Sequence, residues 1–207
     1  MKMYNKKKAK DRYKTISFSD KKQSIIALSV DVRNSTKMKK DIGSEKTVEI
    51  LKPFIEECFI LMKKRNCFYN FIYAGDGIIA ICNVNNDENN FANVYHCAKD
   101  INSFLKDFKI WVKNMYGFGF NAGIGIAWDD KTYIESIKNL PTKMNNILYT
   151  GDSISVASKL SGKRDKQLEK YGIAITKKFY NKLRKKDTVD FKIKTEEICY
   201  TNVSWEE

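Results

Sequence analysis

Residues 25–36 have the sequence IIALSVDVRNST, which joins an apolar run, a carboxylate and a short polar segment. Residues 25–30 are β-branched and apolar, and this pattern predicts a buried strand. The strand ends at Asp31, and the polar residues that open the next, helix-like segment are Asn34, Ser35 and Thr36. An Asp at such a position can bind a cation, and the first N–H groups of a helix can bind phosphate. Taken alone, an Asp that ends a strand is more often a turn former or a helix cap.

A second motif, Gly75-Asp76-Gly77, joins two further strand-like segments, 68–73 and 78–82. The simplest interpretation is a β-hairpin in which Asp76 serves only the turn. If this hairpin lies beside the first strand in one sheet, however, Asp31 and Asp76 meet at the sheet edge. Two carboxylates in contact repel each other unless a metal joins them, and two-metal phosphoryl transfer uses that arrangement.

The order of the predicted elements indicates the fold class. In chain order we expect strand 25–31, helix 45–64, hairpin 68–82, helix 91–114 and strand 118–127. This β-α-β-β-α-β order is typical of an α+β, ferredoxin-like split βαβ plait, an antiparallel sheet with helices on one face. A small C-terminal αβ extension follows. Its expected parts are an irregular insertion 129–146, strand 147–150, a helix to about residue 160, strand 172–175, helix 176–186 and strands 189–193 and 197–203.

The spacing of apolar residues predicts which helix faces enter the core. In helix 45–64, Pro53 either kinks the helix or marks its start. The predicted inward face of this helix comprises Val48, Leu51, Ile55, Phe59 and Met62. The predicted inward face of helix 91–114 comprises Phe91, Val94, Ala98, Ile101, Leu105 and Phe108.

Composition favours one globular domain. The chain has 207 residues, of which 43% are hydrophobic and 13% aromatic, enough for a sizeable core. We expect residues 1–23 to form a basic arm and residues 24–207 a single domain. Neither a membrane-length apolar run nor a secretory signal is visible, so we expect a cytoplasmic protein. Five scattered cysteines are expected to be mostly buried free thiols, and the single His96 makes structural zinc improbable.

The formal net charge is +13, with Lys concentrated in the first residues and in 163–186. Such a charge can attract nucleic acid or a polyanionic nucleotide. No nucleic-acid-binding motif accompanies it, so nucleic-acid binding stays an alternative that predicts steeply salt-dependent affinity.

Four segments together resemble the catalytic domain of class III nucleotidyl cyclases. These segments are SVDVRNST (29–36), YAGDGIIAIC (73–82), FNAGIGIA (120–127) and YTGDSISVASKLSG (149–162). The resemblance covers about residues 25–203, and its specificity lies in four weak motifs that occur in the right order. It implies the metal-dependent cyclisation of a nucleoside triphosphate.

The resemblance also implies roles for individual residues. Asp31, Asp76 and the carbonyl of Val32 would bind two divalent ions, Mn²⁺ or Mg²⁺. The backbone of the next four residues would bind the β- and γ-phosphates, and these residues are Arg33, Asn34, Ser35 and Thr36. Family members are head-to-tail dimers with composite sites, so the partner subunit would supply residues 155 and 159.

Two positions in the segment 149–162 depart from the family pattern. The usual Asn is Ser155 here, which keeps a hydroxyl donor with a shorter reach, and the usual Arg is Lys159, which keeps the charge without the planar fork. These departures leave open a catalytically inactive nucleotide-binding or dimerisation module. Asp152, at the start of the same segment, is expected to cap the helix rather than to act in catalysis.

The base-reading positions depart further from the family. Its members use Lys with Asp for adenine or Glu with Cys for guanine, whereas Ile72 and Leu148 stand at these positions here. Nearby Tyr149, Tyr73 and Arg33 would narrow the pocket or bind a smaller base. In this respect the chain resembles the uridylate and cytidylate cyclases of bacterial Pycsar antiphage systems, whose cyclic UMP or cyclic CMP activates a separate effector. We expect UTP before CTP, with an ordinary adenylate cyclase as the alternative.

Overall fold

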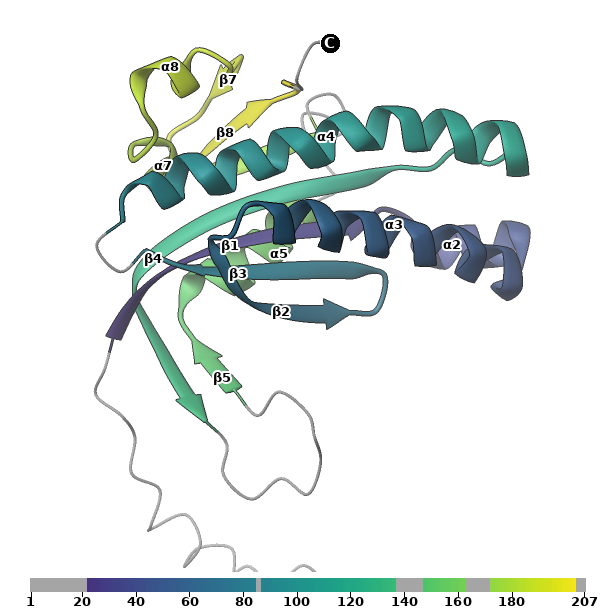
Figure 1. Ribbon diagram of the computed structural model, residues 1–207. Helices are drawn as coiled ribbons and strands as arrows, with labels where there is room; N and C mark the ends of the chain where they lie inside the picture. The colour runs from purple at the N-terminus through teal and green to yellow at the C-terminus, as the bar shows by residue number, and fades with distance from the viewer. Residues whose placement is uncertain (1–21, 85–86, 137–146, 163–171, 204–207) are drawn as a thin grey trace, which may run out of the picture.

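The computed structural model describes residues 22–84, 87–136, 147–162 and 172–203 (Figure 1). Its strands are β1 (Lys22–Val32), β2 (Phe68–Ala74), β3 (Gly77–Asn83), β4 (Ala122–Ser136), β5 (Ile147–Thr150), β6 (Ile173–Thr176), β7 (Ile193–Lys194) and β8 (Ile198–Thr201). Its helices are α2 (Ser35–Ile42), α3 (Ser44–Lys64), α4 (Asn89–Tyr116), α5 (Asp152–Gly162), α7 (Lys177–Tyr180) and α8 (Lys185–Thr188). The predicted α+β plait is confirmed.

One mixed sheet has the order β2-β3-β1-β4-β6-β8-β7, and β5 pairs with the distal part of β4. The central strand β1 is antiparallel to both β3 and β4, whereas β4 and β6 are parallel. The antiparallel pattern that we expected therefore holds for the core and fails where the C-terminal extension joins it. A crossover through α5 brings β6 beside β4, and such a crossover produces a parallel pair.

The two faces of the sheet carry different helices. Side chains such as Ile26, Leu28 and Val30 enter the main core with α3 and α4, which lie on the same side of the sheet (Figure 1). On the opposite face, Ala27 and neighbouring apolar residues pack against Ala157 of α5. We expected helices on one face only. Successive residues of β1 are buried, so this strand has buried side chains on both faces of the sheet, and α5 covers the second face.

The predicted inward face of α4 is confirmed, since all six residues are buried. The predicted face of α3 is wrong at Val48, which is 62% exposed. The fully inward positions of α3 are Thr47, Ile50, Phe54, Cys58 and Met62. Phe54 places its ring 5.2 Å from that of Phe120 and 6.0 Å from that of Phe108. This aromatic contact turns the helix by about one position relative to the expectation, and Pro53 lies inside the helix rather than at its start.

Three expectations for the second half of the chain need correction. Residues 129–136, expected to be irregular, extend β4, because the first residues of β1 continue to pair with it up to Lys22 opposite Tyr133. The remainder of that insertion, 137–146, lies outside the described residues. The expected helix 176–186 is two short helices, α7 and α8, and the expected closing strands shorten to β7 and β8. Thr176 caps α7 by accepting the Phe179 N–H at 3.3 Å.

The small C-terminal lobe, made of α7, α8, β7 and β8, lies at the opposite end of the molecule from α2 (Figure 1). Asp187 of α8 joins the lobe to α4 by accepting a hydrogen bond from His96 Nε2 at 2.9 Å, and it also accepts one from Arg184 Nε, the residue before α8, at 2.9 Å. All five cysteines are free thiols, four of them buried, as predicted. Among the described residues, no helix is both long enough and apolar enough to cross a membrane.

Candidate active site

The sheet brings Asp31 and the Asp76 hairpin to one edge. Asp31, the penultimate residue of β1, lies opposite Gly77 of β3, and Asp76 immediately precedes that glycine in the turn. A Cβ atom at Gly77 would lie 2.7 Å from the Val30 oxygen and 2.9 Å from Asp31 Oδ1. Glycine is therefore needed at Gly77, because a side chain there would force β1 and the hairpin apart.

The electrostatics of this edge favour a cation. The pKa of Asp31 is raised to about 6, mainly by burial and in addition by the negative charge of Asp76. The charge of Arg33 and a hydrogen bond from the Val32 backbone act in the opposite direction and are outweighed. A bound cation would relieve both unfavourable effects.

The oxygen atoms at this edge fit a hard divalent ion. Within the described ranges, no three His, Cys, Asp or Glu side chains gather in a metal-binding arrangement. Mg²⁺ is commonly held by one or two carboxylates together with substrate phosphates and water. Asp31, Asp76 and the Val32 carbonyl match the protein part of such a donor set.

The loop after β1 presents a helix N-terminus to the same edge. Asn34 adopts a left-handed conformation with φ 59°, and α2 begins at Ser35 without a side-chain cap from Asn34. The Arg33 N–H donates to the Asn121 carbonyl at 2.9 Å and so belongs to the sheet. If the predicted phosphate contacts form, they would therefore fall to the N–H groups of Asn34, Ser35 and Thr36 rather than to that of Arg33.

The Arg33 side chain has a position that the sequence did not indicate. It is only 7% exposed, and a Cβ atom at Gly123 would lie 2.7 Å from its Nη2. Burial lowers the pKa of Lys109 on α4, and the charge of Arg33 lowers it further. Arg33 thus places a buried positive charge behind the loop, where we expected its side chain to border the base pocket.

Ser155 and Lys159 lie one turn apart on α5, and both are exposed. Residues at i and i+4 share one face of a helix. The opposite side of α5 packs against the sheet through Ala157, Leu160 and Ser161. The pair therefore faces outward, as a contribution to a neighbouring subunit would require.

The residues predicted to surround the base lie on the α5 side of the sheet or at its rim. Ile72 of β2 and Tyr149 of β5 pack against the same apolar cluster, and Leu148 beside them is 46% exposed. Asn70, a residue not predicted from the sequence, is 9% exposed and donates from Nδ2 to the Tyr149 hydroxyl at 2.5 Å. The strand alternation could have revealed it, because Asn70 shares a face with Ile72.

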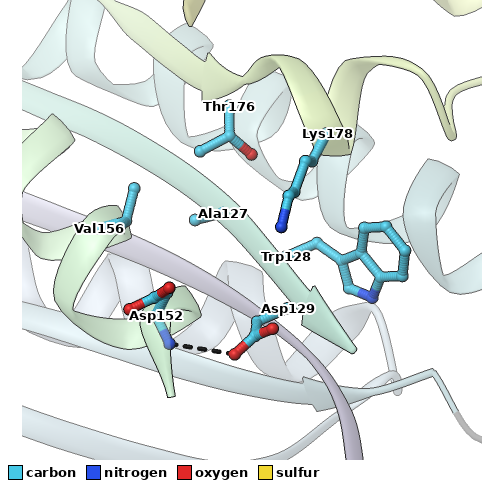
Figure 2. Close-up of a pocket in the computed structure, with 7 residues that line it drawn as sticks. All are labelled: Ala127, Trp128, Asp129, Asp152, Val156, Thr176 and Lys178. Carbon is cyan, nitrogen blue, oxygen red and sulfur yellow. Dashed lines mark hydrogen bonds between the residues drawn. The ribbon is translucent and has the colours of Figure 1, made fainter. Parts of the chain in front are cut away.

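Two further expectations change at the edges of this site. Tyr73, expected near the base, contacts the ring of Phe59 of α3 at 6.4 Å on the other side of the sheet. Asp152, expected to cap α5, instead donates its own N–H to Asp129 Oδ2 at 3.1 Å (Figure 2). The cap is thus a carboxylate from β4, which the sequence did not indicate.

Comparisons by sequence find no matching family model and no matching curated protein. Comparisons by structure find many similar chains. A bacterial light-regulated adenylyl cyclase superposes with a TM-score of 0.68 at 16% identity, covering 88% of this chain and 91% of the other. The adenylyl cyclase CyaB from P. aeruginosa gives 0.66 at 15% identity, covering 87% and 94%.

A third similar structure is the guanylate cyclase domain of RhGC from Catenaria anguillulae in complex with GTP. It superposes with a TM-score of 0.64 at 15% identity, covering 90% of this chain and 100% of the other. At these identities the similarity establishes the fold, and this chain has the fold of adenylyl and guanylyl cyclase catalytic domains.

Proposed function

We propose that this chain is a divalent-metal-dependent nucleotidyl cyclase that converts a pyrimidine nucleoside triphosphate, UTP before CTP, into the 3′,5′-cyclic monophosphate and pyrophosphate. The observation that carries the proposal is the meeting of Asp31 and Asp76 beside the start of α2. The fold shared with cyclase domains supports it. In this proposal residues 24–207 are one catalytic domain and residues 1–23 a basic arm.

Asp31, Asp76 and the Val32 carbonyl would hold two Mn²⁺ or Mg²⁺ ions. Bound there, the ions would lower the pKa of the ribose 3′-hydroxyl and neutralise charge on the departing pyrophosphate. The N–H groups at the start of α2 would bind the β- and γ-phosphates, since a helix N-terminus stabilises anions.

The remaining groups would come from a second copy of the chain in a head-to-tail homodimer. The exposed face of α5 supports this, because Ser155 and Lys159 point away from their own sheet. The Ser155 hydroxyl would orient the ribose, and the Lys159 ammonium would stabilise negative charge in the transition state. A lysine offers a point charge instead of a planar fork, so we expect catalysis slower than that of an arginine variant.

The composition of the predicted base pocket supports a pyrimidine. Ile72 and Leu148 offer no hydrogen bond to the edge of a purine. The Tyr149 ring, whose hydroxyl is held by Asn70, adds bulk beside Ile72. The second candidate is an adenylate cyclase, because two of the similar structures are adenylyl cyclases.

The biological role that we propose is production of a second messenger. The cyclic pyrimidine nucleotide would activate a separate effector in bacterial antiphage defence. This role predicts that phage infection raises the cellular concentration of the cyclic nucleotide. An unchanged concentration after infection would contradict it.

Product analysis tests the activity. The full chain is incubated with Mn²⁺ and with ATP, GTP, CTP or UTP, and the products are identified by chromatography and mass spectrometry. We expect cyclic UMP from the native chain, none from Asp76→Ala, and an unchanged yield from Asp107→Ala, which removes an exposed carboxylate of α4. Cyclic AMP would establish the second candidate, and absence of any product would favour an inactive nucleotide-binding module.

A further inference from the structure

The first turn of α5 is tied to the sheet by a buried carboxylate of β4. Asp129 is 9% exposed, and its Oδ2 accepts the Asp152 N–H at 3.1 Å and the Thr132 hydroxyl at 3.4 Å. Its Oδ1 accepts the Lys131 N–H at 3.1 Å. Figure 2 shows Asp129 turned toward the start of α5, at the rim of a cavity of about 160 Å³. The Asp129 side chain therefore joins β4 to α5, through a contact with a residue 23 positions later in the sequence.

The body of α5 lies directly on the backbone of β4. A Cβ atom at Gly125 would lie 2.2 Å from the Ala157 oxygen, and one at Gly123 would lie 2.2 Å from the Ser161 oxygen. No layer of side chains separates the helix from these two glycines. At the far end of α5, the Ser161 hydroxyl bonds that of Ser29 at 2.8 Å. The glycines allow this close approach of the helix, and the polar contacts at its two ends oppose its sliding along the sheet.

The Asp129 contact lies one turn away from the outward-facing pair on α5. The Ser155 hydroxyl donates to the Asp152 carbonyl at 3.2 Å, so a movement of Asp152 changes the position of Ser155 first. Lys159 follows one turn later on the same face. Thr132 is fully buried and supports the contact, because its hydroxyl lies within 3.5 Å of Ser153 Oγ as well as bonding Asp129.

We infer that Asp129 is a positioning residue for catalysis in the partner subunit: it fixes the first turn of α5 and so aims Ser155 and Lys159 at the partner's nucleotide. This inference rests on the proposed function, since it assumes that α5 completes a site in a second copy. Asp129 itself contacts no substrate. Its Oδ2 accepts from α5 and from Thr132 while its Oδ1 accepts the Lys131 N–H, and an Asn at this position, which retains one oxygen, cannot accept all three hydrogen bonds.

Kinetics of single variants give the first test. We expect Asp129→Ala to lower kcat by roughly tenfold to a hundredfold, because small misplacements of catalytic groups have effects of that size. KM should stay within about twofold, since the carboxylate site that binds the nucleotide is untouched. The kcat of Asp129→Asn should lie between the values of Asp129→Ala and the native chain. Asp130→Ala, which removes the neighbouring but exposed carboxylate, should leave kcat unchanged. A native kcat in Asp129→Ala would overturn the inference.

Mixed dimers separate positioning across the interface from a defect within one chain. The Asp129→Ala chain keeps its carboxylate pair, and the Asp76→Ala chain keeps its α5. An equal mixture contains heterodimers with one intact composite site, so we expect about a quarter of the native activity. The two variants measured separately should remain far below that value. No recovery on mixing well-folded variants would contradict the inference.

Hydrogen exchange provides a readout that needs no activity. In Asp129→Ala we expect faster exchange of the amides in the first turn of α5, with β1 and β3 unchanged. Unchanged exchange in α5, or faster exchange throughout the sheet, would show that Asp129 does not act locally. If the native chain forms no cyclic nucleotide, the proposed function fails, and the exchange comparison still decides whether Asp129 holds α5.

Discussion

Asp31, at the end of β1 just before α2, and Asp187, in α8, have opposite electrostatic environments, and α2 and α8 lie at opposite ends of the molecule (Figure 1). Burial, together with the nearby charge of Asp76, raises the pKa of Asp31 to about 6. Burial also acts to raise the pKa of Asp187, but hydrogen bonds and charges from His96 and Arg184 outweigh it and hold that pKa below its usual value.

The difference separates a carboxylate that stabilises the fold from one that is suited to a ligand. Asp187 is only 5% exposed and meets two basic side chains, so its charge is compensated within the protein. Asp31 faces a second carboxylate, and its charge remains unfavourable in the protein alone. Such a site gains most when a cation binds.

The largest effect should follow from Asp187→Ala. Removing the carboxylate deletes the acceptor that His96 and Arg184 share and should lower the free energy of unfolding by about 3 kcal/mol at neutral pH. Because the pKa of Asp187 is lowered in the folded state, its contribution is present above the usual Asp pKa and is lost as the pH falls. Urea denaturation at pH 7.5 and at pH 2, which lies well below the usual Asp pKa, measures both effects. Asp107→Ala, at an exposed position, is the control. Equal stability of Asp187→Ala and Asp107→Ala would refute the claim that the Asp187 charge is compensated by His96 and Arg184.

Divalent ions should produce the next largest effect, and only at the other end of the molecule. Mn²⁺ at a hundredfold excess over its dissociation constant should raise the stability of the native chain by about 2.7 kcal/mol. The gain should persist in Asp187→Ala, because that residue is remote from the site, and should be lost in Asp31→Asn. Thermal unfolding with and without Mn²⁺ measures it. A gain retained by Asp31→Asn would place the ion elsewhere.

Asp31→Asn should stabilise the metal-free chain, in contrast to Asp187→Ala. A raised pKa means that the favourable contribution of protonated Asp31 is fully present below 3.8, its unfolded value, and is lost as the pH rises through about 6. At pH 7.5 with chelator, we expect a gain on the order of 1 kcal/mol, after allowing for solvent screening at this half-buried group. The gain should vanish at pH 3.5. Destabilisation at pH 7.5 would contradict the assignment.

The smallest predicted effect is on the pKa of Asp31 itself. Asp76→Asn removes the neighbouring charge and should move that pKa downward, while burial, the larger cause, keeps it above the usual Asp value. An NMR titration of the Asp31 carboxyl carbon measures the change. An unaltered pKa would mean that the two carboxylates do not interact.

The features that the sequence predicted correctly have a strong local pattern. The inward face of α4 follows from one regular apolar stripe, and the meeting of Asp31 with the Asp76 hairpin follows from pairing neighbouring strands. Val48 was misassigned because α3 has apolar residues on adjacent faces, and only the packing of Phe54 selects one of them.

The missed features depend on contacts between distant segments. Nothing near Asp129 in sequence indicates that it caps α5, since the contact spans 23 residues. Arg33 was expected beside the base pocket, yet its side chain is buried against Gly123. The partners of these side chains are set by the packing of α5 on β4, which local propensity does not encode.

The central claim is that Asp31 and Asp76 form the centre that binds metal and nucleotide. Electron paramagnetic resonance of Mn²⁺, titrated into the full chain with a non-cyclisable UTP analogue, counts the bound ions directly. We predict two Mn²⁺ ions per chain in the native protein, fewer in Asp76→Asn and Asp31→Asn, and two in Asp107→Ala. No bound Mn²⁺ in the native chain would contradict the claim, and so would two bound ions per chain in both Asp76→Asn and Asp31→Asn.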